Sequence, residues 1–261
     1  MLNKTLLIVS DKFHNFASRK DVITRSEFYS LLQSKNVIFP KNDKIRLIPG
    51  QGFSENDVEY ILKLALSTKN ASHFDFSMWQ RHPKRASSQL THKHSQENIL
   101  ISEPERLSRD EFSMDILIDE CCEMMRDHQT GLHVQGILLL EASRQGYLAI
   151  IEKFFSFKDI DKKYFIFNKM NVNYNRFAFP LPATLKATIR EMDFSNNKKQ
   201  QATMDMEIIQ CGNCSASFSL DMTIMTNKRI SIMETKLANK SLDEHINHLM
   251  KTEYVMETNH A

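Results

Sequence analysis

The longest apolar stretch of the chain lies near its middle and has no polar face. From Gly136 to Ile151 the sequence reads G-I-L-L-L-E-A-S-R-Q-G-Y-L-A-I-I, with apolar residues on every side of the helical repeat. A helix that is apolar all round is buried, and a length of about 16 residues corresponds to about 24 Å. The pattern therefore predicts a long core helix around which the rest of the chain is organised.

Strand-like patterns flank this helix on both sides. Before it, apolar and polar residues alternate from Glu111 to Ile118, as they do in a half-buried strand. After it, five runs are typical of strands: Tyr164–Tyr174, Thr184–Met192, Thr203–Gln210, Ser215–Met225 and Arg229–Leu237. Gly212-Asn213 between two of these runs predicts a two-residue hairpin turn. We therefore expect an α+β fold in which an antiparallel sheet wraps the helix.

The first 80 residues predict a separate, small α/β domain. Three runs are of strand type: Thr5–Val9, Lys44–Ile48 and His73–Trp79. Between them, Thr24-x-x-Glu27 is a capping-box pattern for a helix that ends near Gln33, and Ser54 caps a second, amphipathic helix. The β-α-β-α-β order predicts a small parallel sheet.

The remaining boundaries follow from composition. Residues 81–104 are polar and lack periodicity, which predicts a solvated linker. The alternative is that its basic residues contact an acidic carrier protein or a phosphate: Arg81, Lys84, Arg85 and Lys93. Residues 105–240 then form the domain with the long helix. Ser241-x-x-Glu244 is a second capping-box pattern, so residues 241–261 predict a short helix and a frayed tail.

Composition excludes several classes of protein. Hydrophobic residues make up 41% of the chain and charged residues 25%, which is ordinary for a globular protein. A formal net charge of +2 without a basic stripe gives no support to nucleic-acid binding. No apolar run is long enough to span a membrane, and Leu6–Val9 is too short for a signal-peptide core. We therefore expect a cytoplasmic protein without membrane contact.

Three short motifs are too weak to predict a site. Gly50-Gln51-Gly52 follows a strand and precedes a helix, but it lacks the third glycine of a nucleotide-binding loop, so a tight turn is favoured. Cys211-x-x-Cys214 has no second pair at zinc-ribbon spacing, and we expect reduced thiols and no metal. His245 and His248 lack a third ligand nearby.

The polar residues of the core helix carry the candidate chemistry. Glu141, Arg144 and Gln145 lie at spacings of three and four, so they share one face of an otherwise apolar helix. Charge is costly in such a place unless it is paired or used. One interpretation is a purely structural ion pair between Glu141 and Arg144. The other is a functional site, because a glycine loop with His128 and His133 leads directly into the helix.

The segment D-H…H-V-Q-G-I-L-L-L-E-A-S-R-Q, residues 127–145, resembles the motif of the A-factor biosynthesis hotdog family. These proteins are β-ketoacyl transferases of γ-butyrolactone signal synthesis, and the resemblance extends more loosely from Arg106 to Leu237. The segment is also similar, more distantly, to the β-hydroxyacyl dehydratases of the hotdog fold. The resemblance implies a hotdog fold and transfer of a β-ketoacyl group from an acyl carrier protein to the hydroxyl of dihydroxyacetone phosphate. No resident cofactor is implied, since the acyl group arrives on phosphopantetheine.

This resemblance assigns roles to individual residues. The backbone around Gly136 and Ile137 would hold the thioester oxygen at the amino end of the helix. Glu141, with a pKa raised by its apolar surroundings, would act as general base, and His128 or His133 is the competing base. Arg144 would bind the phosphate or the β-keto oxygen. Gln145 is a third polar group beside Glu141 and Arg144, and the substrate's phosphate has two secondary candidates: Arg176 and Arg190.

Alternatives to acyl transfer remain open. Hotdog dehydration or thioester hydrolysis needs a histidine and an acid but no arginine, so Arg144 favours acyl transfer. A non-catalytic module that binds acyl thioesters or lactones would show the same residues without turnover. We also expect a homodimer, because family members commonly carry two copies of the motif and this chain has one, which would leave a sheet edge exposed.

Overall fold

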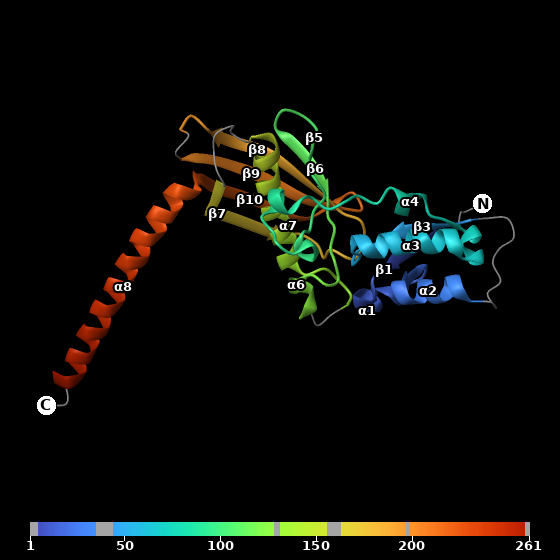
Figure 1. The fold of residues 1–261 in the computed structure, drawn as a ribbon, viewed down its shortest axis with the longest axis horizontal. Helices are drawn as coiled ribbons and strands as arrows, with labels where there is room; N and C mark the ends of the chain where they lie inside the picture. Colours follow the sequence, from blue (N-terminus) through green and yellow to red (C-terminus); the bar gives the residue numbers. More distant parts are fainter. Residues whose placement is uncertain (1–4, 35–43, 128–130, 156–162, 197–198, 259–261) are drawn as a thin grey trace.

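The computed structural model describes residues 5–34, 44–127, 131–155, 163–196 and 199–258, with the side chains of 251–258 left out. Two sheets organise this part of the chain. The first is a four-stranded parallel sheet near the amino terminus, and the second is a six-stranded antiparallel sheet that contains all later strands. Figure 1 shows the two units side by side, with one long helix directed away from both.

The predicted amino-terminal α/β unit is confirmed. Its strands are β1 (Thr5–Val9), β2 (Val22–Thr24), β3 (Ile45–Pro49) and β4 (Phe74–Asp75), in the order β2-β1-β3-β4. Two helices, α2 (Arg25–Gln33) and α3 (Glu55–Ser67), pack on one face. Four shorter helical segments complete the unit: α1 (His14–Ala17), α4 (Ser77–Gln80) and the 3₁₀ turns at Asp11–Phe13 and Lys69–His73.

Local signals placed both helices of this unit correctly. The Thr24 hydroxyl accepts the N–H of Glu27 while the Glu27 carboxylate accepts the N–H of Thr24, and Ser54 and Asp57 repeat the arrangement before α3. Such boxes satisfy two N–H groups that a helix start leaves unpaired. The expected strand at His73–Trp79 is wrong beyond Asp75. There the Asp75 carboxylate accepts the N–H of Ser77, which turns the chain into α4.

The second sheet confirms the predicted hotdog fold. Its order is β5-β6-β8-β9-β10-β7, with these bounds: β5 (Glu105–Arg106), β6 (Glu111–Asp115), β7 (Lys163–Tyr174), β8 (Thr184–Asp193), β9 (Gln200–Gln210) and β10 (Asn213–Thr226). Between β6 and β7 the chain forms the short α6 (Glu123–Arg126) and the long α7 (Gly136–Phe154). The helix therefore continues about one turn past the predicted end at Ile151.

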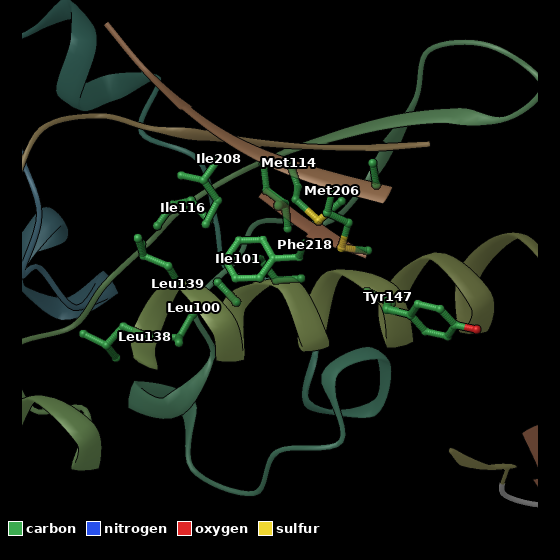
Figure 2. Packing of buried hydrophobic residues seen from close by; sticks show 14 of the residues in the cluster. Leu100, Ile101, Met114, Ile116, Leu138, Leu139, Tyr147, Met206, Ile208 and Phe218 are labelled. Carbon is green, nitrogen blue, oxygen red and sulfur yellow. The ribbon is translucent and has the colours of Figure 1, made fainter. Parts of the chain in front are cut away.

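Helix α7 is the centre of the core. Eleven of its residues are buried, including every residue from Gln145 to Ile151. Figure 2 shows side chains from the sheet, such as Met206 and Phe218, packed against it, together with Leu100 and Ile101 from the segment before β5. The Tyr147 hydroxyl donates to a backbone carbonyl at 2.7 Å. Protein packs against α7 both from the sheet and from the segment before β5, which explains why the helix has apolar residues on every side.

The hairpin between β9 and β10 turns one residue earlier than predicted. Strand β9 ends at Gln210 and β10 begins at Asn213, so the two turn residues are Cys211 and Gly212 rather than Gly212 and Asn213. Both have positive φ, 51° and 74°. Positive φ at both central residues is the backbone of a type I′ turn, one of the two-residue turns that match the twist of the strands. All four cysteines are free thiols, and the part of the chain that the structure describes contains no His/Cys/Asp/Glu group suited to a metal.

The segment predicted as a solvated linker is instead packed into the molecule. Residues 81–104 contain α5 (Ser88–Thr91), which lies on α7, and the 3₁₀ turn Gln96–Asn98. Arg85 is buried with a side chain 3% exposed, and it donates to the carbonyls of Ile99 and Phe53. Asp119 faces its guanidinium at 3.8 Å. Arg85 is therefore unavailable to a carrier protein, contrary to one of the two interpretations of this segment.

The two units share a core. In β1, Leu6 and Ile8 pack with the amino-terminal helices, whereas Leu7 and Val9 belong to the cluster that surrounds α7. This division follows from the alternation of side chains along a strand. The Gln51 side chain then joins the units by hydrogen bonds to the backbone of Ile116 and Ile118. The α/β unit is thus one side of the body that encloses α7.

The carboxy-terminal part differs most from expectation. Residues Arg229–Leu237 are helical, not a strand, and the capping-box residues Ser241 and Glu244 lie inside a helix. Both belong to the single helix α8 (Asn227–Thr258). In the run R-I-S-I-M-E-T-K-L, apolar and polar residues alternate only in part, and several residues are good helix formers. The run therefore forms a helix where it has no neighbouring strand to pair with. No helix in the described ranges is both long and apolar enough for a membrane span.

Candidate active site

The amino end of α7 carries backbone donors without partners. Gln135 caps the helix with an extended backbone and without a side-chain hydrogen bond. Within the described ranges, no acceptor meets the N–H groups of Gly136 and Ile137, as is usual for first-turn donors that no side chain caps. Ile137 is 49% exposed. This end of the helix can therefore present donors to a ligand oxygen, as the resemblance implies.

Tyr174, the last residue of β7, lies across the first turn of α7. Its hydroxyl donates to the carbonyl oxygen of Gly136 at 2.9 Å. A Cβ atom at Gly136 would lie 2.9 Å from the tyrosine ring, so only glycine fits beneath it. Burial raises the pKa of Tyr174 above its usual range. Tyr174 thus fixes the position of the helix start, a role that the sequence analysis did not assign.

The loop after β7 brings two predicted residues to the same place. The N–H of Val134 donates to the carbonyl of Ala178 at 2.8 Å, which pairs the loop with the residues just before α7. The rings of His133 and Phe177 are in contact, with centroids 5.1 Å apart. Arg176 is exposed in this loop. His133 and Arg176 therefore belong to segments that meet at the amino end of α7, whereas His128 lies outside the described residues.

Glu141 is the centre of a charged cluster one to two turns further along α7. Arg144 binds it with a fork, from Nε to Oε2 at 2.7 Å and from Nη2 to Oε1 at 2.8 Å. Lys93, from the segment after α5, places Nζ 2.8 Å from Oε1. The three side chains are 14% (Glu141), 26% (Arg144) and 25% (Lys93) exposed. Two cations on one carboxylate leave the cluster with an excess positive charge that faces solvent.

The expected raised pKa of Glu141 is wrong. Burial by itself raises the pKa of Glu141, and the hydrogen bonds and charge of Arg144 act against it. With further hydrogen bonds from Lys93 and Gln145, the pKa falls from 4.5 to about 2. A general base works best with a pKa near the operating pH, so a carboxylate this acidic accepts a proton poorly. The ion-pair interpretation of Glu141 and Arg144 describes the observed geometry.

The side-chain amide of Gln145 is hydrogen-bonded to other parts of the protein and is therefore not available to a substrate. Its Oε1 accepts the N–H of Leu100 at 2.8 Å, and its Nε2 donates to the carbonyl of Asn98 at 2.8 Å and to Glu141 at 3.0 Å. The side chain is fully buried. The prediction of Gln145 as a substrate contact is therefore not supported. It fastens the segment that carries Lys93 to α7.

Arg190 is separated from the rest of the predicted site. Along β8, Leu185, Ala187 and Ile189 face the core with α7, and Arg190 lies on the other face. There it pairs with Asp205 at 2.6 Å in an open groove of about 430 Å³. Arg190 therefore cannot join Arg144 at one phosphate, because the sheet stands between them.

Sequence reasoning missed Lys93 as a member of the α7 cluster. It lies in a stretch without periodicity, and its contact with Glu141 joins residues far apart in the chain. Only the packing of α5 on α7 brings them together. Tyr174 was missed for the same reason, since the end of a strand gives no local sign of the helix that it will contact.

The comparison with protein families decides the identity of this fold. The family model of the A-factor biosynthesis hotdog domain matches residues 75–226, more than half of the chain. The chain belongs to this family. The matched region contains the whole α7 cluster and includes the packed segment before β5, so the family domain begins earlier than the predicted boundary at residue 105.

Solved structures similar to this A-factor biosynthesis hotdog protein include bacterial thioesterases. A mutant thioesterase from Pseudomonas aeruginosa is 17% identical, covering 48% of this chain and 81% of its own, with a TM-score of 0.36. A thioesterase from Haemophilus influenzae is 13% identical, covering 59% and 92%, with a TM-score of 0.36. No curated protein matched the chain.

Proposed function

We propose that this hotdog protein is an acyltransferase that moves a β-ketoacyl group from a carrier-protein thioester to a hydroxyl of dihydroxyacetone phosphate or a similar small phosphorylated acceptor. Family membership supports an enzyme that acts on acyl thioesters. The phosphorylated acceptor is inferred from the pairing of Arg144 and Lys93 with the single carboxylate of Glu141. The unneutralised charge suits a phosphate, which arginine and lysine bind well.

In this proposal the reaction takes place at the amino end of α7. The thioester carbonyl oxygen accepts hydrogen bonds from the N–H groups of Gly136 and Ile137, which stabilise the oxyanion. The acceptor hydroxyl attacks the carbonyl carbon, and its proton passes to a histidine, His133 or His128. The C–S bond then breaks, and the carrier thiol leaves with a proton. Arg144 and Lys93 hold the acceptor's phosphate, and Glu141 holds both cations in position.

We further propose that acyl carrier protein is the donor and that the chain forms a homodimer through its hotdog part. Strand β7 is one of the two edge strands of the antiparallel sheet, and most of its residues are partly or fully exposed. An exposed strand edge is a common site of pairing with a second chain. Sedimentation at micromolar concentration should give a dimer. A fully stable monomer there would contradict this proposal.

The deciding experiment combines purified protein with a β-ketoacyl thioester, with and without dihydroxyacetone phosphate, and reads the products by mass spectrometry. Acyl transfer predicts an ester that requires the acceptor. Free acid formed without acceptor indicates a thioesterase, and binding without turnover indicates a non-catalytic module. A parallel incubation with a β-hydroxyacyl thioester tests the dehydratase alternative, which predicts loss of water. Each of these three results would contradict the proposal.

A matched pair of variants tests the phosphate site. Arg144→Lys keeps the charge and loses the planar fork, so transfer to a phosphorylated acceptor should fall on the order of tenfold or more. Arg190→Lys is the control, because Arg190 also pairs with a carboxylate but lies on the opposite face of the sheet. Near-normal transfer by a folded Arg144→Lys protein would show that Arg144 serves only Glu141.

A further inference from the structure

Two loops meet at the amino end of α7, and both contact the amino-terminal unit. One is the segment 131–135, which carries His133 into the helix, and the other is the segment 175–183, which follows β7. The hydrogen bond from Val134 to Ala178 joins them. The structure describes every residue of both loops, and neither contains a helix or strand of its own. Their positions therefore depend on contacts with their neighbours.

Helix α1 contacts the first loop through its backbone. The N–H of Phe16 donates to the carbonyl oxygen of Gly131 at 3.2 Å. Gly131 is buried, and a Cβ atom there would collide with the carbonyl oxygen of Lys12. The Lys12 ammonium donates in turn to the carbonyl oxygen of Arg126 at 3.1 Å, at the end of α6, which faces α1 in Figure 1. Only glycine allows an approach this close, so the first loop packs directly on the start of the amino-terminal unit.

The same residue of α1 also contacts the second loop. The Phe16 ring stacks on the Phe179 ring, with centroids 5.7 Å apart and an angle of 25° between the ring planes. Aromatic pairs stabilise a contact beyond the area that they bury. Gln51 adds two hydrogen bonds, from its N–H to the carbonyl oxygen of Pro180 at 3.1 Å and from its Nε2 to that of Leu181 at 3.2 Å. The amino-terminal unit thus binds three consecutive residues of this loop.

The second loop in turn positions His133. The Phe177 ring of this loop packs against the His133 imidazole, with centroids 5.1 Å apart. Phe177 lies two residues before Phe179, so a shift of the loop at Phe179 moves the surface that the imidazole contacts. In an active site a displacement on the order of 1 Å can lower the rate on the order of a hundredfold. Most of the amino-terminal unit precedes the matched family domain, so the proposed site depends on contacts from outside that domain.

We propose that Phe16 is a positioning residue for acyl transfer. It acts through Gly131 and Phe179, which keep the two loops in place against each other and against the amino end of α7. The loops then hold the His133 imidazole beside the thioester, where it receives the proton of the acceptor hydroxyl. This inference rests on the proposed function and gives the amino-terminal unit a part in it. A merely structural Phe16 would contribute to the stability of the fold and to nothing else.

Replacement of Phe16 by alanine tests the role in turnover. The kcat of transfer should fall on the order of tenfold or more. The KM for the phosphorylated acceptor should stay within about twofold of wild type, because Arg144 and Lys93 lie on neither loop. Phe16→Tyr keeps the ring and should restore near-normal kcat.

The matched control removes another half-buried ring from the amino-terminal unit. Tyr29 forms a T-shaped pair with Tyr60, with centroids 5.3 Å apart, between α2 and α3 and away from both loops. Tyr29→Ala therefore also loses one aromatic pair. Its kcat should stay within about twofold of wild type, so an equal fall of kcat in both variants would show that Phe16 acts only through stability.

Amide hydrogen exchange observes the loops without turnover. The N–H of Val134 donates to Ala178, so its exchange rate reports the pairing of the two loops. In Phe16→Ala this rate should rise by several-fold to about tenfold, the factor expected for loss of one aromatic pair. The rate is compared with that of the buried Met206 in β9, which corrects for any change in global stability. Tyr29→Ala should leave this ratio unchanged.

Gly131→Ala disturbs the same contact from the other side and keeps the test available if Phe16→Ala does not fold. The new Cβ displaces the first loop from Lys12, so kcat should again fall and Val134 should again exchange faster. Normal kcat in either folded variant, or a Val134 ratio equal to that of Tyr29→Ala, would overturn the positioning role. Absence of transfer by wild type would refute the proposed function instead, and the Val134 ratio would still decide whether Phe16 holds the loops.

Discussion

Replacement of Glu141 by glutamine separates the ion-pair role from the general-base role. Glutamine keeps the size of the side chain and part of its hydrogen bonding, but it removes the negative charge that Arg144 and Lys93 share. If Glu141 holds these two cations, the protein should lose stability and the phosphate site should loosen. A general base would instead give loss of rate with an unchanged fold.

The size of the stability loss follows from the pKa of Glu141. A fall from 4.5 to about 2 means that ionised Glu141 stabilises the fold by about 3 kcal/mol at neutral pH. Its side chain is only 14% exposed, so solvent weakens this interaction little. In a chain of this length that corresponds to a fall of roughly 5–10 °C in Tm.

The loss of stability in Glu141→Gln should depend on pH. Because the folded-state pKa of Glu141 is depressed, its contribution is complete above pH 4.5 and disappears as the pH falls toward 2. The difference in unfolding free energy between wild type and Glu141→Gln should therefore be largest at neutral pH and shrink below pH 4.5. Urea unfolding across this range measures it, and Glu207→Gln, an exposed glutamate on the outer face of the sheet, is the control.

Two results would refute this reasoning. A Glu141→Gln protein that melts within about 1 °C of wild type at neutral pH would show that the cations do not depend on Glu141. A difference that stays constant from pH 7 to pH 3 would show that something other than its charge was lost. Normal melting with transfer reduced by a factor on the order of 10² or more would instead restore Glu141 as the base.

Three further substitutions test the packing that positions the site. Gly50→Ala should destabilise the protein by a few kcal/mol in chemical denaturation, because the new Cβ would lie 2.6 Å from the carbonyl oxygen of Pro180; unchanged stability would contradict the contact between the two units. Arg85→Met should lower the unfolding free energy by about 3–5 kcal/mol, since it leaves Asp119 buried without its cation; a stable variant would mean that the pair is dispensable. Tyr147→Phe should lower Tm by roughly 2–4 °C through loss of one buried hydrogen bond, and a larger fall would indicate repacking around α7.

Several features that depend on residues close in sequence were predicted well, although the capping-box pattern at Ser241 was wrong. The buried α7 follows from an apolar pattern with no polar side, and the capping box at Thr24 and the helix cap at Ser54 involve residues only three positions apart. The hotdog fold followed from the order of the elements together with the 127–145 motif. The run 229–237 failed because its composition suits a helix as well as a strand, and only the absence of a neighbouring strand decides between them.

The chemistry of the site was decided by tertiary contacts. The sequence by itself determined that Glu141 and Arg144 share one face of a buried helix, because helical spacing requires it. It could not determine that Lys93 would reach the same carboxylate, nor that Gln145 would be bound by the backbone of Leu100. Burial alone raises the pKa of a carboxyl, and partners from other segments reverse the direction. Those partners are known only when the chain is folded, because electrostatic energy depends on distance in space and not on position in the sequence.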